Sequence, residues 1–207
     1  MNRDRYHHGN LRDALIDAAL GLIAERGPTG FTFAEAARQV GVSPAAPYRH
    51  FRDREALVAE VARRGFDLFE AALRAGWNDG KPEPLGAMIA CGRAYLAFVR
   101  RYPSYYAAMF GSDQPAGADP AFQAAGERAF GVLKEAAEML CGRCPAEVRP
   151  PALMVALHLW SMTHGIASLF LGRPDGPRRM LPMAPEELLE AEILIYTRSL
   201  GLDNLPS

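Results

Sequence analysis

Residues 32–51, TFAEAARQVGVSPAAPYRHF, constrain the fold of this chain more than any other stretch. Thr32 and Glu35 have the spacing of a capping box, so a helix should begin at Phe33. Gly41 follows a small apolar face and suits the left-handed conformation in which many helices end. These signals predict a short helix that closes at a glycine turn.

A second short helix is expected after this turn. Ser43 is a favoured N-cap, and Pro44 fits a first helical turn because its missing N–H needs no partner there. This helix should carry Tyr48, Arg49 and His50. Two short helices joined by a glycine turn predict a helix-turn-helix motif, and the alternative is an αα-hairpin that only packs.

The composition does not by itself indicate a nucleic-acid partner. The 207 residues carry 23 Lys and Arg against 24 Asp and Glu, a net charge of −1. A DNA-binding interpretation must therefore rest on local clusters of charge. Hydrophobic residues make up 49% of the chain, and helical periods are far more frequent than alternating runs. The sequence predicts an all-α fold with a sizeable core.

Two longer helices should flank the motif. Residues 11–26 repeat apolar side chains at helical spacing. Asp53 should cap a helix that runs from Arg54 to about residue 75. Residues 1–9 hold several basic side chains and are either a frayed terminus or an arm that touches DNA. The buried face of the second long helix is expected to comprise Leu57, Val58, Val61, Leu68, Phe69 and Leu73.

This arrangement resembles the DNA-binding domain of the TetR family of bacterial repressors. The resemblance rests on a leading helix, then T-x-x-x-A-A-x-x-x-G-V-S, then Y-x-H-F with a basic residue three positions on. It covers about residues 10–60. It implies that Tyr48, His50 and Arg54 contact DNA phosphates. It implies the same role for Thr32, which lies at the start of the first helix of the motif. The expected DNA-binding residues are Thr32, Ser43, Pro44, Ala45, Tyr48, Arg49, His50 and Arg54.

The recognition helix departs from the family pattern. By resemblance it begins at Ser43 and Ala45, but Ala45-Ala46-Pro47 stands where the family usually has Gly-Thr-Leu or a similar triplet. Pro47 removes an N–H donor and disfavours helical geometry at Ala46. The expected consequence is a tilt of the recognition helix.

The remainder of the chain should form a second helical domain after a loop at residues 76–84. Ser104 and Asp119 are expected N-caps, and residues 111–117 and 172–184 have the composition of connectors. Helices are expected over residues 85–101, 104–110, 119–140, 152–171 and 185–200.

The helix at residues 152–171 carries no charge over 20 residues, which is a transmembrane length. Polar groups such as His158 would be costly against lipid, so a helix buried in a core or a dimer interface is the better interpretation. Trp160, His164 and Gly165 resemble the signature of the WHG-type C-terminal domain of some TetR-family regulators. In that family the last two helices of two chains form the dimer interface, which implies a homodimer here.

Aromatic and sulfur-containing side chains are dense between residues 95 and 110. Small-molecule sites are mostly apolar with a few placed polar groups, and tyrosine supplies both. A simple core is the alternative for each single residue. The predicted site for a small, largely apolar effector comprises Tyr95, Phe98, Tyr102, Tyr106, Met109, Phe110, Met162 and His164.

Neither a metal site nor a cofactor is predicted. Cys141 and Cys144 form a C-x-x-C, but no second such pair exists and no histidine lies near it in sequence, so two loop-end residues are the better interpretation. His158 and His164 lie about 120° apart around a helix, which favours satisfied core histidines over metal ligands. The nucleotide-binding loop and the H-E-x-x-H motif are absent.

These features predict a cytoplasmic transcriptional regulator, not an enzyme and not a membrane protein; the N-terminus lacks the apolar run of a signal peptide. Its partners would be double-stranded operator DNA, a second copy of the chain and a small-molecule effector. The expected function is a repressor released from a palindromic operator by the effector. The alternative is a small-molecule-binding or redox enzyme that uses the helical C-terminal domain.

The expected domains are 1–53 for DNA binding, 54–75 as a connecting helix, and 85–207 for ligand binding and dimerisation.

Overall fold

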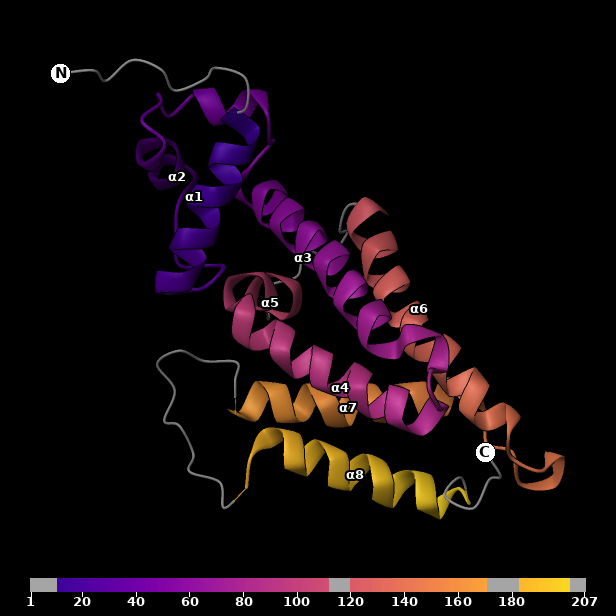
Figure 1. Cartoon of the computed structure of the whole chain (residues 1–207). Helices are drawn as coiled ribbons and strands as arrows, with labels where there is room; N and C mark the ends of the chain where they lie inside the picture. The colour runs from indigo at the N-terminus through magenta and orange to yellow at the C-terminus, as the bar shows by residue number, and fades with distance from the viewer. Residues whose placement is uncertain (1–10, 112–119, 171–182, 202–207) are drawn as a thin grey trace. The chain divides into compact units, whose positions relative to one another are not determined.

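The computed structural model describes residues 11–111, 120–170 and 183–201, and every regular element in those ranges is a helix (Figure 1). This confirms the predicted all-α fold. The chain divides into two compact units: residues 1–65 with 104–123 form the first, and residues 66–103 with 124–207 form the second. The basic N-terminal stretch, the cap at Asp119 and nearly all of the two connectors lie outside the described residues.

The first unit contains α1 (Leu11–Arg26), α2 (Phe33–Gln39), the 3-10 helix η1 (Ala46–Arg49), the start of α3 (Arg54–Trp77) and nearly all of α5 (Pro103–Phe110). Helix α1 packs against α2 and η1, and its predicted apolar stripe is buried apart from Leu11, which is half-buried. The core around the motif is formed by Leu15, Ile16, Ala19, Phe31, Phe33, Ala36, Ala37 and Phe51.

The second half of the motif differs from the prediction. In place of a helix capped by Ser43, the chain makes a turn followed by η1, and no side chain caps it. An α-helix after Ser43 would begin with an N–H from the fourth residue along, which is Pro47 and has none. The Ala46 N–H instead donates to the Ser43 carbonyl at 3.0 Å, which tightens the backbone to 3-10 geometry.

The second unit contains the rest of α3, η2 (Asn78–Gly80), α4 (Pro84–Arg101), most of α6 (Pro120–Gly142), η3 (Ala146–Val148), α7 (Ala152–Phe170) and α8 (Pro185–Ser199). Helices α4, α7 and α8 pack on one another, and Figure 1 shows them stacked side by side. Two ion pairs join α4 to α8, Arg93 with Glu190 at 2.6 Å and Arg100 with Glu186.

Several predicted boundaries and faces need correction. Helix α3 continues through Gly76 and Trp77, because the indole is buried, so the predicted loop begins two residues later. Helix α5 begins at Pro103 and not after a Ser104 cap. Leu68 was expected in the core but is 39% exposed. His158 was expected to be a core histidine; its ring is exposed and stacks on Tyr196 with centroids 3.9 Å apart.

Gly76 of α3 lies against the backbone of α4. A Cβ there would be 2.9 Å from the Ala90 carbonyl oxygen and 2.9 Å from the Cys91 Cα. Because backbone atoms cannot swing aside, Gly76→Ala should lower the free energy of urea unfolding by about 1–3 kcal/mol. Gly131 in α6 is the control, since nothing lies within 4 Å of its added Cβ. Gly131→Ala should raise stability by about 0.5–1 kcal/mol. Equal effects of the two changes would contradict this close packing.

Candidate DNA-binding site

Helix α2 is held at both ends by the local signals in the sequence. The Thr32 hydroxyl accepts from the Glu35 N–H at 3.2 Å, and the Glu35 carboxylate accepts from the Thr32 N–H at 2.7 Å. Gly41 has φ of 74°, and the Val42 N–H donates to the Ala37 carbonyl at 3.0 Å. Both the predicted capping box and the predicted glycine stop are therefore confirmed.

Charged and polar side chains also connect the Thr32 end of α2 to α1. The hydrogen bonds from Thr32, supported by one from Arg26 at 2.9 Å, lower the pKa of Glu35 to about 2. Glu35 is therefore fully ionised at neutral pH and holds the loop before α2 to the end of α1. Thr32 itself remains exposed.

Most side chains between residues 43 and 50 form an exposed strip. Tyr48 is 62% exposed, and its ring stands edge-on against Phe33 with centroids 5.0 Å apart. That contact fixes the direction of the phenol while leaving its hydroxyl outside the core. No ion pair within the described ranges engages Arg49. The predicted residues that share this exposure are Ser43, Pro44, Ala45, Tyr48, Arg49 and His50.

The Arg54 side chain is less available for a DNA phosphate than the sequence suggested. Its guanidinium donates to Glu55 at 2.7 Å and to the Pro28 carbonyl at 3.2 Å, and it lies 5.9 Å from the centroid of the Phe31 ring. The hydrogen bond from Arg54 lowers the pKa of Glu55. A contact between Arg54 and a DNA phosphate would therefore require exchange of the Glu55 carboxylate for the phosphate.

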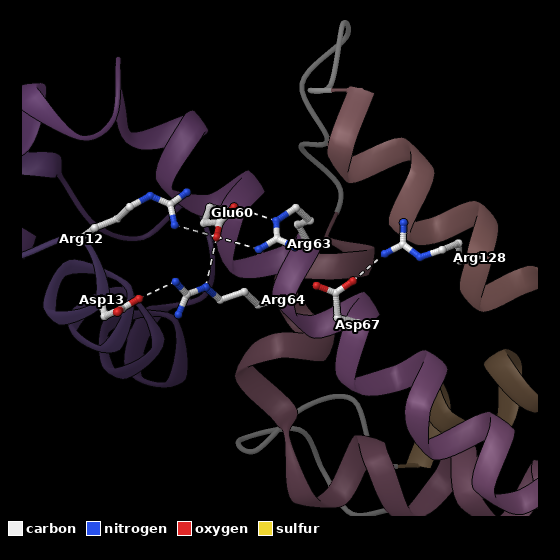
Figure 2. Close-up of polar contacts among 7 residues, drawn as sticks. All are labelled: Arg12, Asp13, Glu60, Arg63, Arg64, Asp67 and Arg128. Carbon is white, nitrogen blue, oxygen red and sulfur yellow. Dashed lines mark hydrogen bonds and ion pairs between the residues drawn. The ribbon is translucent and has the colours of Figure 1, made fainter. Parts of the chain in front are cut away.

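A larger ion-pair network joins α1 to α3 within the first unit (Figure 2). Glu60 is 9% exposed and accepts from Arg63 at 2.8 and 2.9 Å, from Arg12 at 3.0 Å and from Arg64 at 3.1 Å. Arg64 also pairs with Asp13. Hydrogen bonds from Arg63 above all, and from Arg12 and Arg64, lower the pKa of Glu60 to about 2, although burial raises it. Sequence analysis missed this network.

The other end of α3 pairs with α6 inside the second unit. Arg128 donates to Asp67 at 2.6 Å, as Figure 2 shows, and to Glu70 at 3.2 Å. Arg74 links Glu70 to Glu135 at 3.0 and 3.3 Å. These pairs lie on the solvent side of α3, so each contributes modestly while together they fix the register of the two helices.

The predicted effector residues are divided between the two compact units. Tyr106, Met109 and Phe110 belong to the first, where the Tyr106 and Phe110 rings lie 5.0 Å apart. The other five belong to the second. They are Tyr95, Phe98, Tyr102, Met162 and His164.

The structure brings a polar pair into the apolar interior of the second unit. The Tyr95 hydroxyl and His164 Nδ1 are 2.9 Å apart, and burial lowers the pKa of His164. The Phe69 ring stands edge-on to Tyr95 at 4.8 Å and lies 4.9 Å from Phe98. Phe69 was predicted as a core residue but not as a member of this cluster. The imidazole and the tyrosine hydroxyl are the kind of polar groups that orient a ligand in a mostly apolar site.

Two protein-family models match this chain. One, described as bacterial regulatory proteins of the tetR family, matches residues 15–61. The other, described as a tetracyclin repressor-like C-terminal domain, matches residues 88–195, which is more than half of the chain. The chain belongs to the TetR family. It is therefore a DNA-binding transcriptional regulator, and the resemblance seen in the sequence is confirmed.

Individual relatives agree with this assignment. This TetR-family chain is 27% identical over 100 residues to an uncharacterized HTH-type transcriptional regulator, YobS, from Bacillus subtilis (strain 168). That alignment covers 48% of this chain and 51% of YobS, so the chain spans about half the length of that curated relative.

Solved structures extend the likeness over nearly the whole chain. A protein of unknown function from Rhodococcus sp. RHA1 is 28% identical, with a TM-score of 0.77, covering 95% of this chain and 98% of that one. AibR, solved in complex with isovaleryl coenzyme A and operator DNA, is 22% identical, with a TM-score of 0.67 and coverage of 89% and 96%. At that identity AibR shows a shared fold alone.

The C-x-x-C pair and the long apolar helix of this TetR-family regulator can also be located in the fold. Cys141 and Cys144 are both buried as free thiols, and burial with the nearby Cys144 raises the pKa of Cys141. No group of three His, Cys, Asp or Glu able to hold a metal occurs among the residues that the structure describes. Helix α7 is long and apolar enough to cross a membrane, a test that core helices of soluble proteins also pass.

Proposed function

We propose that this regulator is a homodimeric, cytoplasmic repressor that leaves a palindromic operator when a small, largely apolar effector binds. The observation that carries the proposal is the exposed strip from Ser43 to His50 on a locally capped helix-turn-helix. Residues 1–53 would bind DNA, residues 54–75 would connect, and residues 85–207 would bind the effector and dimerise.

The roles within the strip follow from chemistry and exposure. Tyr48 and His50 offer exposed hydrogen-bonding tips suited to phosphates, and Thr32 lies at the start of α2. Arg49 adds an exposed cation. Contacts of this kind position a protein on DNA without specifying sequence, whereas Ser43, Pro44 and Ala45 would face the bases.

A second copy of the chain is supported by the outer face of α7 and α8. Large apolar side chains there are exposed, although both helices pack well on their inner faces. An exposed apolar patch of this kind marks an interaction surface in a soluble protein. The exposed members are Leu153, Met154, Leu157, Leu169 and Ile195.

The proposed effector would meet the aromatic residues around Tyr95 and His164. Because burial lowers the pKa of His164, the pair would favour a neutral polar group over an anion. AibR has been solved in complex with isovaleryl coenzyme A. A small acyl or aromatic compound is the class that we propose here, with its polar end at the Tyr95–His164 pair.

Selection from a pool of random DNA duplexes tests the proposal directly. The purified chain should retain duplexes that share two inverted half-sites whose centres lie about 34 Å apart or a small multiple of that distance. Retention of unrelated sequences with no shared pattern would contradict operator recognition. Candidate effectors are then tested by whether they release the selected duplex.

Arg54→Ala should weaken binding to every duplex sequence. If Arg54 exchanges Glu55 for a phosphate, its loss removes one neutralised phosphate per subunit, so the slope of log K against log salt should become shallower by about one unit per subunit. Fluorescence anisotropy at several salt concentrations measures both quantities. Arg143→Ala, an exposed cation of the second unit, is the control and should change neither. An altered sequence preference with an unchanged slope would contradict the phosphate role.

A further inference from the structure

The segment Ser43–Pro47 has an unusual chemical surface for a part of a helix-turn-helix that faces DNA bases. Pro44 and Ala45 are exposed, Ala46 is half-buried and Pro47 is buried. Apart from the Ser43 hydroxyl, no side chain in the segment donates or accepts a hydrogen bond. The other side chains of the segment present only methyl and methylene groups.

The backbone of this segment has few N–H donors to offer in compensation. Pro44 and Pro47 have no N–H, and the Ala46 N–H is already bonded to the Ser43 carbonyl at 3.0 Å. The two prolines also fix φ at both ends of the Ala45-Ala46 pair. The segment is therefore a rigid apolar edge, defined here as Pro44, Ala45 and Ala46, that pays little conformational entropy on binding.

An edge of this kind can distinguish one feature of the major groove. Arginine, lysine, asparagine and glutamine read bases through pairs of hydrogen bonds, and none of these occurs between residues 43 and 47. Alanine and other apolar groups instead contact the C5-methyl of thymine, which adenine, guanine and cytosine lack. A methyl group removed from water contributes about 0.8 kcal/mol, or roughly fourfold in affinity.

We infer that this regulator recognises its operator through thymine methyl groups held against the Pro44–Ala46 edge, with Ala45 at the centre of the contact. The inference rests on the proposed function, because it requires this segment to face the major groove. It adds the chemical identity of the bases that are read. Discrimination is then modest at each base pair and depends on several thymines placed at fixed positions in each half-site.

Replacing thymine by uracil tests this inference with the unaltered protein. Uracil keeps every hydrogen-bonding group of thymine and removes only the C5-methyl. Each thymine of a selected operator is replaced in turn, and affinity is measured by fluorescence anisotropy at fixed salt. At one or more positions in each half-site, uracil should weaken binding about fourfold, and about fifteenfold when both half-sites are changed. Uracil in the flanking DNA is the control and should have no effect.

The variant Ala45→Gly assigns the contact to a residue. If the Ala45 methyl meets the thymine methyl, the variant should bind thymine and uracil operators within about twofold of each other, because the methyl–methyl contact is absent from both. Circular dichroism confirms that the variant folds. An unchanged uracil penalty in the folded variant would overturn the role of Ala45.

The possible failures are distinguishable. If an operator is selected and uracil is tolerated at every thymine, thymine recognition is wrong while the proposed repressor function stands. If no duplex is retained at all, the proposed function fails and the inference fails with it.

Discussion

Glu60→Ala should destabilise the first unit by about 3 kcal/mol, the largest stability loss that we expect from a single charged residue in this chain. The substitution leaves the guanidinium groups of Arg12, Arg63 and Arg64 facing one another without their shared carboxylate. The value lies at the low end for a buried ion pair because the arginines are partly exposed. Hydrogen exchange of the α1 amides measures this loss locally, and affinity for the selected operator should fall with it.

Two comparison variants separate charge from packing. Glu60→Gln keeps the shape of the side chain and should still lose most of the stabilisation, because a neutral amide does not offset three positive charges. Glu138→Ala removes a carboxylate from an exposed pair with Lys134 and should change stability by less than about 0.5 kcal/mol. Equal losses for the Glu60 and Glu138 variants would show that the network contributes no more than an ordinary surface pair.

The same network predicts an acid-sensitive contact between α1 and α3. The pKa of Glu60 is lowered from 4.5 to about 2 in the folded chain. A group with a depressed pKa stabilises the fold fully above its ordinary pKa and loses that contribution as the pH falls toward the folded value. The stabilising effect of Glu60 relative to glutamine should therefore be complete at pH 6 and should fade between about pH 4.5 and pH 2. Unfolding curves of both proteins across this range check the sign.

Short-range hydrogen bonding explains which parts of the motif were predictable. The capping box of Thr32 and Glu35 and the stop at Gly41 involve residues at most five positions apart, so the sequence contains all of their partners. The apolar stripe of α1 follows likewise from helical spacing alone. Exposure of Tyr48 and its neighbours follows from their place on a short element with only one face against the core.

The errors arose where two local signals competed or where the partner was distant. Ser43-Pro44 is a sound helix start, but Pro47 removes the N–H that the first α-helical turn needs. The chain therefore forms a turn and a 3-10 helix in place of an α-helix. Arg12 and Glu60 are 48 residues apart, and no periodicity links them. Leu68 fits an apolar spacing, yet it lies at the edge of the face that α3 buries. The last two outcomes depend on tertiary neighbours, whereas the first depends on Pro47 alone.

Leu157→Glu should convert the proposed homodimer into monomers at micromolar concentration. Leu157 is 44% exposed on the outer face of α7 in the single chain, so a carboxylate there stays solvated and the fold of each subunit survives. In a two-fold dimer the change occurs twice on one self-complementary surface, and two charges would lose their water. The dissociation constant of the dimer should rise at least about 100-fold, equivalent to about 2.7 kcal/mol. Sedimentation velocity measures it.

Met139→Glu provides a matched control, because Met139 is 43% exposed but lies on α6. This variant should remain a dimer, which would show that adding one carboxylate per chain is not itself disruptive. The Leu157 variant should also lose affinity for a two-half-site operator far more than for a single half-site, because only a dimer engages both halves at once. A Leu157→Glu protein that sediments as a dimer would place the interface on another surface. Equal losses of affinity for the two DNAs would instead show that dimerisation through α7 and α8 does not contribute to operator binding.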